Sequence, residues 1–238
     1  EAKDYKRIGE GDSGLNTGGM GSVSPVAFAD KNFMQKVEER IVIPTVNGLR
    51  NENIDYKGFI FIGLMNVDGN PYVIEYNVRM GDPETESVFP RIQSDVEELF
   101  EHTFAGTLNN IELKVAEQTA ACVMMVAKGY PESYPKGDVI EGIENVTDSL
   151  VFHAGTALNA NGETITNGGR VICVTSLADT LNDALDKSYQ SVEKIQWQNK
   201  YFRRDIGKDV LPQEYPHKPA WTQPSQQYHD RAEPEKRQ

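Results

Sequence analysis

The segment from 75 to 86 reads Glu75-Tyr76-Asn77-Val78-Arg79-Met80-Gly81-Asp82-Pro83-Glu84-Thr85-Glu86. Polar and apolar side chains alternate through its first five residues with the period of a β-strand, so Glu75, Asn77 and Arg79 share one face. A carboxylate and an amide oxygen two residues apart are ligands that Mg²⁺ accepts, and the arginine beyond them can hold a phosphate or a carboxylate bidentately. Spacing alone leaves a second interpretation open, a solvated hairpin surface on which Glu75 and Arg79 pair.

The residues that follow this strand form a crowded acidic loop. Between Gly81 and Glu86 the chain combines one glycine, one proline and three carboxylates. Crowded like charges are costly unless a metal or a cationic ligand offsets them. The loop therefore favours a binding site over a solvated turn.

Upstream of this segment the sequence predicts a helix and a β-hairpin. Apolar residues recur at helical spacing over 30–48, where Pro44 is expected to break or cap the helix. Strands are predicted over 58–66 and 71–77, because Asp68-Gly69 supplies the positive-φ positions of a tight turn. The polar face of 75–79 then lies at the end of the second strand.

A glycine-rich loop over 9–21 follows a strand predicted over 1–8. Its core, Gly14-Leu15-Asn16-Thr17-Gly18-Gly19-Met20-Gly21, lets backbone N–H groups approach an anion without a Cβ in the way. The loop ends without the Gly-Lys-Ser/Thr of a Walker loop and lacks the glycine spacing of a dinucleotide-binding turn. By itself it is weak evidence of a site.

The sequence after residue 93 predicts one more helix, followed by a second domain. The helix runs over 95–107, with Ser94 as its N-cap. Strands over 119–127, 151–157 and 170–175, and a helix over 178–194, indicate a mixed α+β domain. From 211 to 238 the sequence is rich in proline, glutamine and charge, which predicts a flexible tail.

The composition argues against several classes of partner. A net charge of −12 repels a phosphate backbone, so nucleic acid is not expected. No apolar run approaches the roughly 18 residues of a membrane span, and the first residues are unlike an apolar signal segment, so the cytoplasm is the expected compartment. Cys122 and Cys173 lie in predicted strands, where we expect buried free thiols.

Several motifs resemble a single family and occur in the same order along the chain. A hairpin that ends in Glu-x-Asn-x-Arg is similar to the metal-binding end of the ATP-grasp fold, and 79–86 resembles the Arg-x-Gly-Asp-Pro-Glu-x-Glu motif of glycinamide ribonucleotide synthetases. The other similar segments are Asp4-Tyr5-Lys6-Arg7, the 16–21 loop with Ser24-Pro25, Lys128-Gly129-Tyr130-Pro131, 151–156 (VFHAGT), 166–171 (TNGGRV) and Arg204-Asp205-Ile206-Gly207.

The resemblance extends over residues 1–210 and implies an α+β fold. Residues 1–112 would form the second half of an ATP-grasp domain, an antiparallel sheet with helices, and 117–210 a small mixed α+β carboxy-terminal domain before the 211–238 tail. The amino-terminal domain and the first half of the ATP-grasp domain of this family have no counterpart in the chain. We therefore expect the chain to be inactive alone, and the full enzyme to be monomeric.

This family joins glycine to 5-phosphoribosylamine through glycyl phosphate, splitting ATP to ADP and phosphate in purine biosynthesis. By resemblance, Glu75 and Asn77 would hold Mg²⁺ or Mn²⁺, and Arg79 would act in catalysis by orienting the transferred phosphoryl group or the glycine carboxylate. The implied substrate-binding residues are Asn16, Thr17, Gly18, Gly19, Gly21, Gly81, Asp82, Pro83 and Glu84, and the implied nucleotide-binding residues are Lys6, Arg7, Leu64 and Met65. The implied partners are glycine, 5-phosphoribosylamine and ATP, with neither nucleic acid nor membrane.

The chain departs from the ATP-grasp pattern at one expected metal ligand. Many ATP-grasp enzymes carry an acidic ligand on the strand that faces the Glu-x-Asn motif, and that position is Gly63 here. Two alternatives stay open. One is another ATP-grasp carboxylate–amine ligase, against which the Gly-Asp-Pro-Glu and Asn-Thr-Gly-Gly-Met-Gly loops argue. The other is a non-catalytic ATP-grasp remnant that acts as a binding module.

Overall fold

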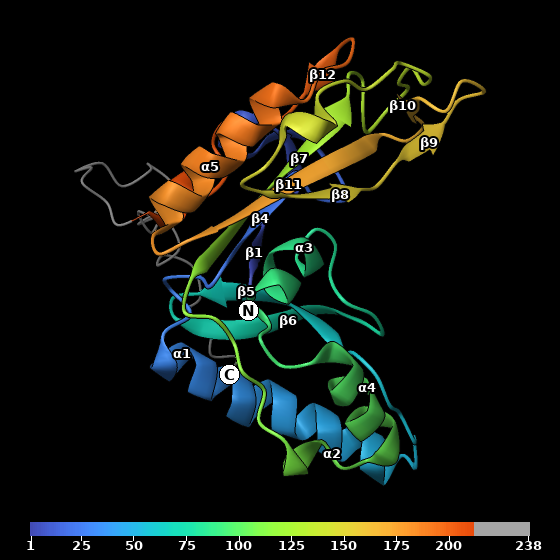
Figure 1. The fold of residues 1–238 in the computed structure, drawn as a ribbon. Coiled ribbons are helices and arrows are strands. Elements are labelled where there is room, and N and C mark those ends of the chain that lie inside the picture. The colour runs from blue at the N-terminus through green and yellow to red at the C-terminus, as the bar shows by residue number, and fades with distance from the viewer. Residues whose placement is uncertain (212–238) are drawn as a thin grey trace, which may run out of the picture.

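The structure is a computed structural model that describes residues 1–211, so the tail predicted for 211–238 lies outside it from 212 onward. Its core contains a six-stranded antiparallel sheet (Figure 1). The strands pair in the order β1 (Lys3–Asp4), β4 (Gly21–Ser24), β7 (Thr119–Ala127), β11 (Arg170–Ala178) and β8 (Leu150–His153), and β12 (Lys200–Tyr201) pairs with β7. The predicted α+β class with antiparallel sheets is confirmed.

The centre of this sheet is apolar because β7 and β11 carry almost no charge. Every residue of β7 from Ala120 to Ala127 is buried, as expected of a strand covered on both faces. Helix α5 (Leu181–Lys194) lies along one face, and α3 (Thr85–Val88) contacts β4, β7 and β11 from the other side (Figure 1). Burying one Val or Met side chain contributes roughly 1.5–3 kcal/mol, so this layer supplies much of the stabilisation.

Helix α5 follows from an amphipathic sequence with a capping residue. Thr180 accepts a hydrogen bond from the backbone N–H of Asp183 over 3.1 Å, which satisfies one free donor of the first turn. Its buried residues recur at helical spacing and face the sheet: Ala184, Leu185, Ser188, Ser191 and Val192. The helix predicted over 178–194 is confirmed from Leu181 onward, whereas Ala178 still belongs to β11.

The amino-terminal segment joins the same sheet in two pieces. The single strand predicted over 1–8 is wrong, because β1 pairs with β4 whereas β2 (Arg7–Gly9) pairs with β3 (Ser13–Asn16). The chain changes partners at Tyr5, which is buried and exchanges backbone hydrogen bonds with Met20 and Gly21. The glycine-rich loop predicted over 9–21 is therefore partly strand, and it also contains the short helical turn η1 (Glu10–Asp12).

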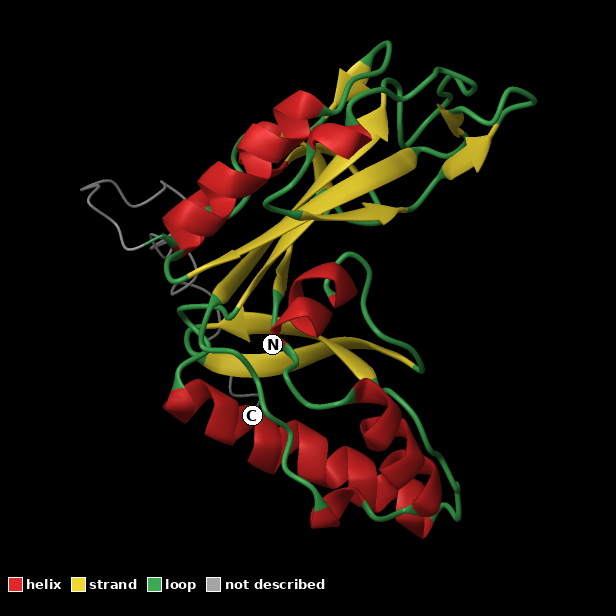
Figure 2. Ribbon diagram, in the orientation of Figure 1, coloured by secondary structure: helices red, strands yellow, loops and turns green. Residues whose placement is uncertain are grey.

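The predicted hairpin is confirmed as β5 (Phe61–Val67) and β6 (Asn70–Asn77). Asp68 has φ 48° and Gly69 has φ 74°, the left-handed pair that a two-residue turn requires. The Asn66 side chain caps this turn by accepting from the Gly69 N–H over 3.0 Å. The hairpin stands apart from the six-stranded sheet, beside the first long helix (Figure 2).

That helix runs on past Pro44 instead of breaking there. It consists of α1 (Lys31–Val37), the π-helical segment η2 (Glu38–Val42) and α2 (Ile43–Asn51). A proline inside an α-helix removes one N–H donor and clashes with the preceding turn. The wider π-helical turn lies directly before Pro44, and the Ile43 N–H donates to the Glu38 carbonyl, so the proline sits in the first turn of α2.

Helix α4 (Val96–Ala105) confirms the helix predicted over 95–107, but its N-cap is not Ser94. Asp95 accepts from the backbone N–H groups of Glu97 and Glu98 over 2.8 and 3.3 Å. Ser94 instead accepts from the Lys114 N–H, outside the helix. Asp95 is the N-cap because it lies one residue nearer the first turn and its charged carboxylate accepts from two backbone N–H groups.

The predicted strand over 151–157 is interrupted at Gly155. It forms the end of β8 and, after a turn, β9 (Thr156–Leu158), which pairs with β10 (Thr164–Thr166). A Cβ at Gly155 would lie 2.5 Å from the Arg170 carbonyl oxygen, so the chain crosses β11 where only glycine fits. The remaining short elements are η3 (Phe89–Arg91), η4 (Leu108–Asn110), η5 (Ile143–Asn145) and η6 (Lys208–Val210).

The two cysteines and the lengths of the helices complete the description of the fold. Cys122 and Cys173 are buried free thiols on β7 and β11, as predicted. Within residues 1–211, none of the helices has both the length and the apolar character that crossing a bilayer requires.

Candidate functional site

The polar face predicted on the hairpin forms at the end of β6. The Asn77 Nδ2 donates to Glu75 Oε1 over 3.1 Å, and Arg79 Nη2 lies 3.5 Å from Asn77 Oδ1. These contacts hold the three side chains on one side of the strand. Across the hairpin, Gly63 is paired with Glu75, and a Cβ there would lie 3.1 Å from Glu75 Cγ.

A cavity of about 310 Å³ collects residues from four separate segments. It is lined by Lys6, Gly18, Phe61, Glu75, Arg79, Gly81, Asp82, Glu84 and Arg170. Seven of these are predicted site residues, and the chain brings them together although they lie on the first strands, the hairpin and the acidic loop. Phe61 and Arg170 complete the lining.

Two buried carboxylates lie at this cavity: Glu84 lines it, and Asp4 is paired with the lining residue Lys6. Glu84 is only 8% exposed, and burial raises its pKa, with the nearby charge of Asp4 adding to the rise. Burial also raises the pKa of Asp4, against the opposing pull of Lys6, whose Nζ is 2.6 Å from Asp4 Oδ2. Within residues 1–211, Asp4 Oδ1 and Glu84 Oε2 are buried without a hydrogen-bond partner. Such groups are costly unless a donor reaches them, so the site is suited to a cationic ligand.

Arg170, at the start of β11, was missed by sequence reasoning. Its guanidinium forms a bidentate pair with Asp82, with Nη1–Oδ1 and Nη2–Oδ2 distances of 2.6 and 2.7 Å. Burial lowers the pKa of Arg170, but the hydrogen bonds and charge of Asp82 outweigh this and leave the pKa raised. The residue lies in the segment TNGGRV, but an arginine that opens a strand carries no signal of a site until its partner is known.

Three predicted loop residues lie next to the cavity without lining it. Thr17 Oγ1 donates to the Lys6 carbonyl and accepts from the Gly19 N–H, over 2.8 and 2.9 Å. Gly19 has φ 118°, and a Cβ there would lie 2.2 Å from Pro83 Cδ. The glycine-rich loop and the acidic loop therefore touch at Gly19 and Pro83.

Other predicted residues lie farther from the lining. Gly21 is buried in β4, where a Cβ would lie 2.5 Å from the Cys122 carbonyl oxygen. Arg7 donates to the Gly14 carbonyl over 2.8 Å, and Asn16 is exposed at the end of β3. Leu64 and Met65 lie on β5 and do not line the cavity. Their roles in binding stay predictions.

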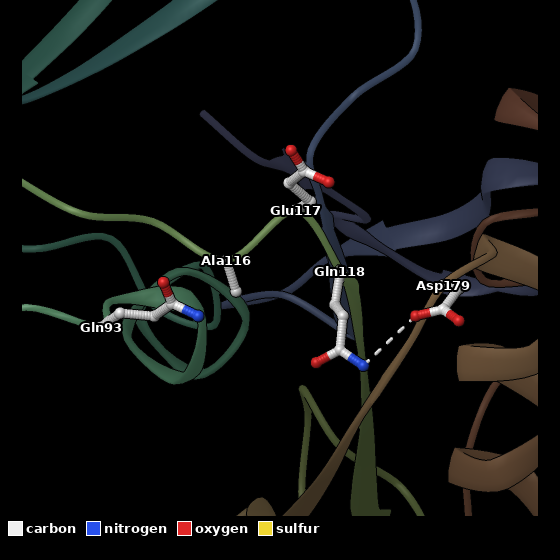
Figure 3. Close-up of a pocket in the computed structure, with 5 residues that line it drawn as sticks. All are labelled: Gln93, Ala116, Glu117, Gln118 and Asp179. Atoms are coloured by element: carbon white, nitrogen blue, oxygen red, sulfur yellow. Dashed lines mark hydrogen bonds between the residues drawn. The ribbon is translucent and has the colours of Figure 1, made fainter.

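A second cavity of about 490 Å³ lies near the junction of η3 and β7 (Figure 3). It is lined by Gln93, Ala116, Glu117, Gln118 and Asp179, and Gln118 Nε2 donates to Asp179 Oδ1 over 3.4 Å. Its lining contains none of the predicted site residues. The seven predicted site residues that line a cavity all line the first one.

Comparison with known families matches two regions of the chain. Residues 1–85 match the model described as "Phosphoribosylglycinamide synthetase, ATP-grasp (A) domain". Residues 120–209 match "Phosphoribosylglycinamide synthetase, C domain". Together the two matches cover most of the chain.

Curated proteins named phosphoribosylamine–glycine ligase are similar over the same region. The protein from Yersinia pestis is 46% identical across 87% of this chain and 49% of its own length. The protein from Caldanaerobacter subterraneus is 42% identical across 86% of this chain and 49% of its own length. The chain thus spans about half the length of these relatives.

Solved structures agree in fold. The crystal structure of phosphoribosylamine–glycine ligase from Thermotoga maritima has a TM-score of 0.77 and 36% identity, covering 86% of this chain and 50% of that one. The biotin carboxylase domain of 2-oxoglutarate carboxylase from Hydrogenobacter thermophilus has a TM-score of 0.52 and 17% identity, covering 77% and 40%, and shows a shared fold alone. The chain belongs to the phosphoribosylglycinamide synthetase family, and it matches the ATP-grasp (A) domain of that family over 1–85 and its C domain over 120–209.

Proposed function

We propose that the chain supplies the metal-binding strand and the substrate loops of an ATP-dependent phosphoribosylamine–glycine ligase. The observation that carries this proposal is the cavity at which Glu75, Arg79, Asp82 and Glu84 meet Lys6. Oxygen ligands, cations and buried carboxylates in one cavity suit a reaction that joins a carboxylate, a nucleotide phosphate and an amine. From the resemblance to this family, and not from the cavity, we also propose the segment boundaries 1–112 and 117–210 and a monomeric full enzyme in the cytoplasm.

Glu75 and Asn77 fit Mg²⁺ or Mn²⁺ as ligands. Both present oxygen atoms on one face of β6, and Mg²⁺ commonly takes one or two protein carboxylates and completes its shell with water and substrate phosphates. In the described part of the chain, no group of three His, Cys, Asp or Glu residues could hold a metal, so the proposed site has few protein ligands. A bound divalent ion would offset the negative charge of the ATP phosphates.

Arg79 and Lys6 are two of the three cationic residues that line the cavity, and the third is Arg170. Arg79 lies two residues beyond Asn77, past the end of β6, where its planar guanidinium can orient the transferred phosphoryl group or the glycine carboxylate. Burial lowers the pKa of Lys6, but the hydrogen bond and charge of Asp4 raise it more, so its ammonium stays charged at neutral pH. Its place in the lining suits contact with a phosphate.

The proposed reaction has two steps, phosphorylation of the glycine carboxylate and attack of the amine on the resulting glycyl phosphate. The glycine carboxylate attacks the γ-phosphorus of ATP, which releases ADP and gives glycyl phosphate. The amine of 5-phosphoribosylamine then attacks the glycyl carbonyl carbon, phosphate leaves with the electrons of the broken C–O bond, and the amine loses one proton. Because negative charge moves in both steps, positioned cations stabilise the transition states. Asp82 and Glu84 would attract the amine.

A direct test is binding of Mg²⁺·ATP, measured by titration calorimetry on the 238-residue chain. We expect Glu75→Ala to weaken binding at least about tenfold, because a charged metal ligand contributes more than an ordinary hydrogen bond. Glu101→Ala, an exposed glutamate on α4, is the matched control and should bind like the parent chain. Equal affinity of the Glu75→Ala variant and the parent would contradict a metal site on β6.

A further inference from the structure

Arg170 is the charged residue of the cavity that the proposed chemistry does not use. Its Nη1 donates to the Gly18 carbonyl over 3.0 Å as well as to Asp82 Oδ1, and its Nη2 donates to Asp82 Oδ2. The side chain is only 20% exposed, whereas that of Asp82 is 50% exposed. One side chain from β11 therefore joins the glycine-rich loop to the acidic loop.

The same glycine is also held through its amide. The Gly18 N–H donates to Tyr130 Oη over 2.9 Å. A Cβ at Gly169 would lie 2.2 Å from Tyr130 Cδ2, so the tyrosine ring rests on the residue directly before Arg170. The N–H and the carbonyl of Gly18 are thus both bound, the first by Tyr130, which follows β7, and the second by Arg170, which begins β11.

This double hold matters because Gly18 and Gly19 are adjacent glycines. Glycine has the largest backbone freedom of any residue, and a two-glycine segment stays ordered only when its polar groups are tied to neighbours. Gly19 adopts φ 118° against Pro83, a conformation that other residues rarely adopt. The loop needs an external partner to keep this geometry.

We infer that Arg170 is a positioning residue that fixes the Gly18 peptide and the Asp82 carboxylate relative to each other, with Tyr130 holding the Gly18 amide. A planar guanidinium suits this task because its donors point in fixed directions toward two acceptors at once. Lysine keeps the charge but offers a single point of contact. The inference rests on the proposed function only in that these loops bind substrate.

The test is amide hydrogen exchange by NMR on the 238-residue chain. For Arg170→Ala we expect about tenfold faster exchange at Gly18 and Gly19, the size expected when a charge-assisted hydrogen bond is lost. Tyr130→Phe should accelerate Gly18 alone, and Arg170→Lys should recover part of the protection. The Met124 N–H, bonded to the Met20 carbonyl inside the sheet, should exchange as in the parent chain.

Arg204→Ala is the matched control, because it removes an arginine–carboxylate pair with Glu193 of 2.7 Å on an exposed surface. It should leave Gly18 and Gly19 unchanged. If Arg170→Ala does not fold, Asp82→Ala at the half-exposed partner takes its place and should also accelerate Gly18. Unchanged exchange at Gly18 and Gly19 in the folded variant would overturn the inference. Equal Mg²⁺·ATP affinity of Glu75→Ala and the parent chain would instead count against the proposed function and leave the exchange result intact.

Discussion

Burial at and near the cavity disfavours the charged form of three carboxyl groups, those of Asp4, Glu84 and Glu86. The sequence predicted a crowded acidic loop, and Glu84 and Glu86 both have pKa values raised mainly by burial. Asp4 could not be assigned from the sequence, because its burial arises only when the first strand joins β4 and the loop around Gly19 closes over it. Periodicity places a side chain on a face, but it does not show what covers that face.

Glu84→Gln is expected to stabilise the fold at neutral pH. Because the folded pKa of Glu84 lies above its unfolded value, folding favours the protonated form, and stability falls as the pH rises from 4.5 through the raised pKa. Above that window the variant removes a buried charge whose Oε2 atom has no hydrogen-bond partner, so we expect about 1 kcal/mol more free energy of unfolding at pH 7. Below 4.5 the gain should vanish, because Glu84 is then protonated in both states.

Urea unfolding at pH 7 and at pH 4 measures this difference. Glu101→Gln on the exposed side of α4 is the control and should change little at either pH. A variant less stable than the parent at pH 7 would mean that the Glu84 carboxylate has a favourable partner.

Elements were predicted well where one local signal dominates. The Asp68-Gly69 turn specified the hairpin, and the apolar run of β7 specified a buried strand. The helix predicted over 30–48 formed, and of the two alternatives for Pro44 only the break failed, because a π-helical turn lets the proline sit in the first turn of α2. The predicted N-cap Ser94 failed because Asp95 takes that role. The predicted strand over 151–157 failed for a tertiary reason, because Gly155 crosses Arg170.

Asp95→Ala is expected to weaken α4 by removing its cap. Two N–H groups of the first turn lose their acceptor, which should lower the free energy of unfolding by about 1 kcal/mol. Asp95→Asn keeps a side-chain oxygen at the same place and should retain most of the stability. Chemical denaturation monitored by circular dichroism compares the three chains, and an alanine variant as stable as the parent would exclude a capping role.

The whole molecule is held together by contacts between its first and last described segments. Arg203 is buried and donates to both Asp205 oxygens over 2.8 Å, to Asp12 over 2.8 Å and to the Arg7 carbonyl over 3.1 Å. Tyr5 donates to Asp209 over 2.6 Å. None of these long-range pairs has a sequence signal, because each partner reads as a surface charge until the chain returns. The six-stranded sheet likewise combines strands from both predicted segments.

Arg203→Met is expected to destabilise the whole chain. It leaves Asp205 and Asp12 without their shared partner, and we expect a loss of about 2 kcal/mol, less than for a fully buried pair because Asp12 is exposed. Arg204→Met, at the exposed neighbour, should cost far less. The midpoint of thermal unfolding is measured for both variants. Equal midpoints would show that the contacts of Arg203 with Asp12 and Asp205 do not stabilise the chain.

The sharing of one sheet by β4 and β7 has a consequence for how the chain can be divided. Residues 120–209 match a family domain by themselves, yet residues 120–123 of β7 bond along one edge to Gly21–Ser24. Excising the C domain at its sequence boundary would bare an apolar strand edge, a template for intermolecular pairing. The sheet that contains β7 therefore extends beyond the matched domain, and a transplant or fusion that is to keep this strand edge paired has to carry residues 21–24 with it.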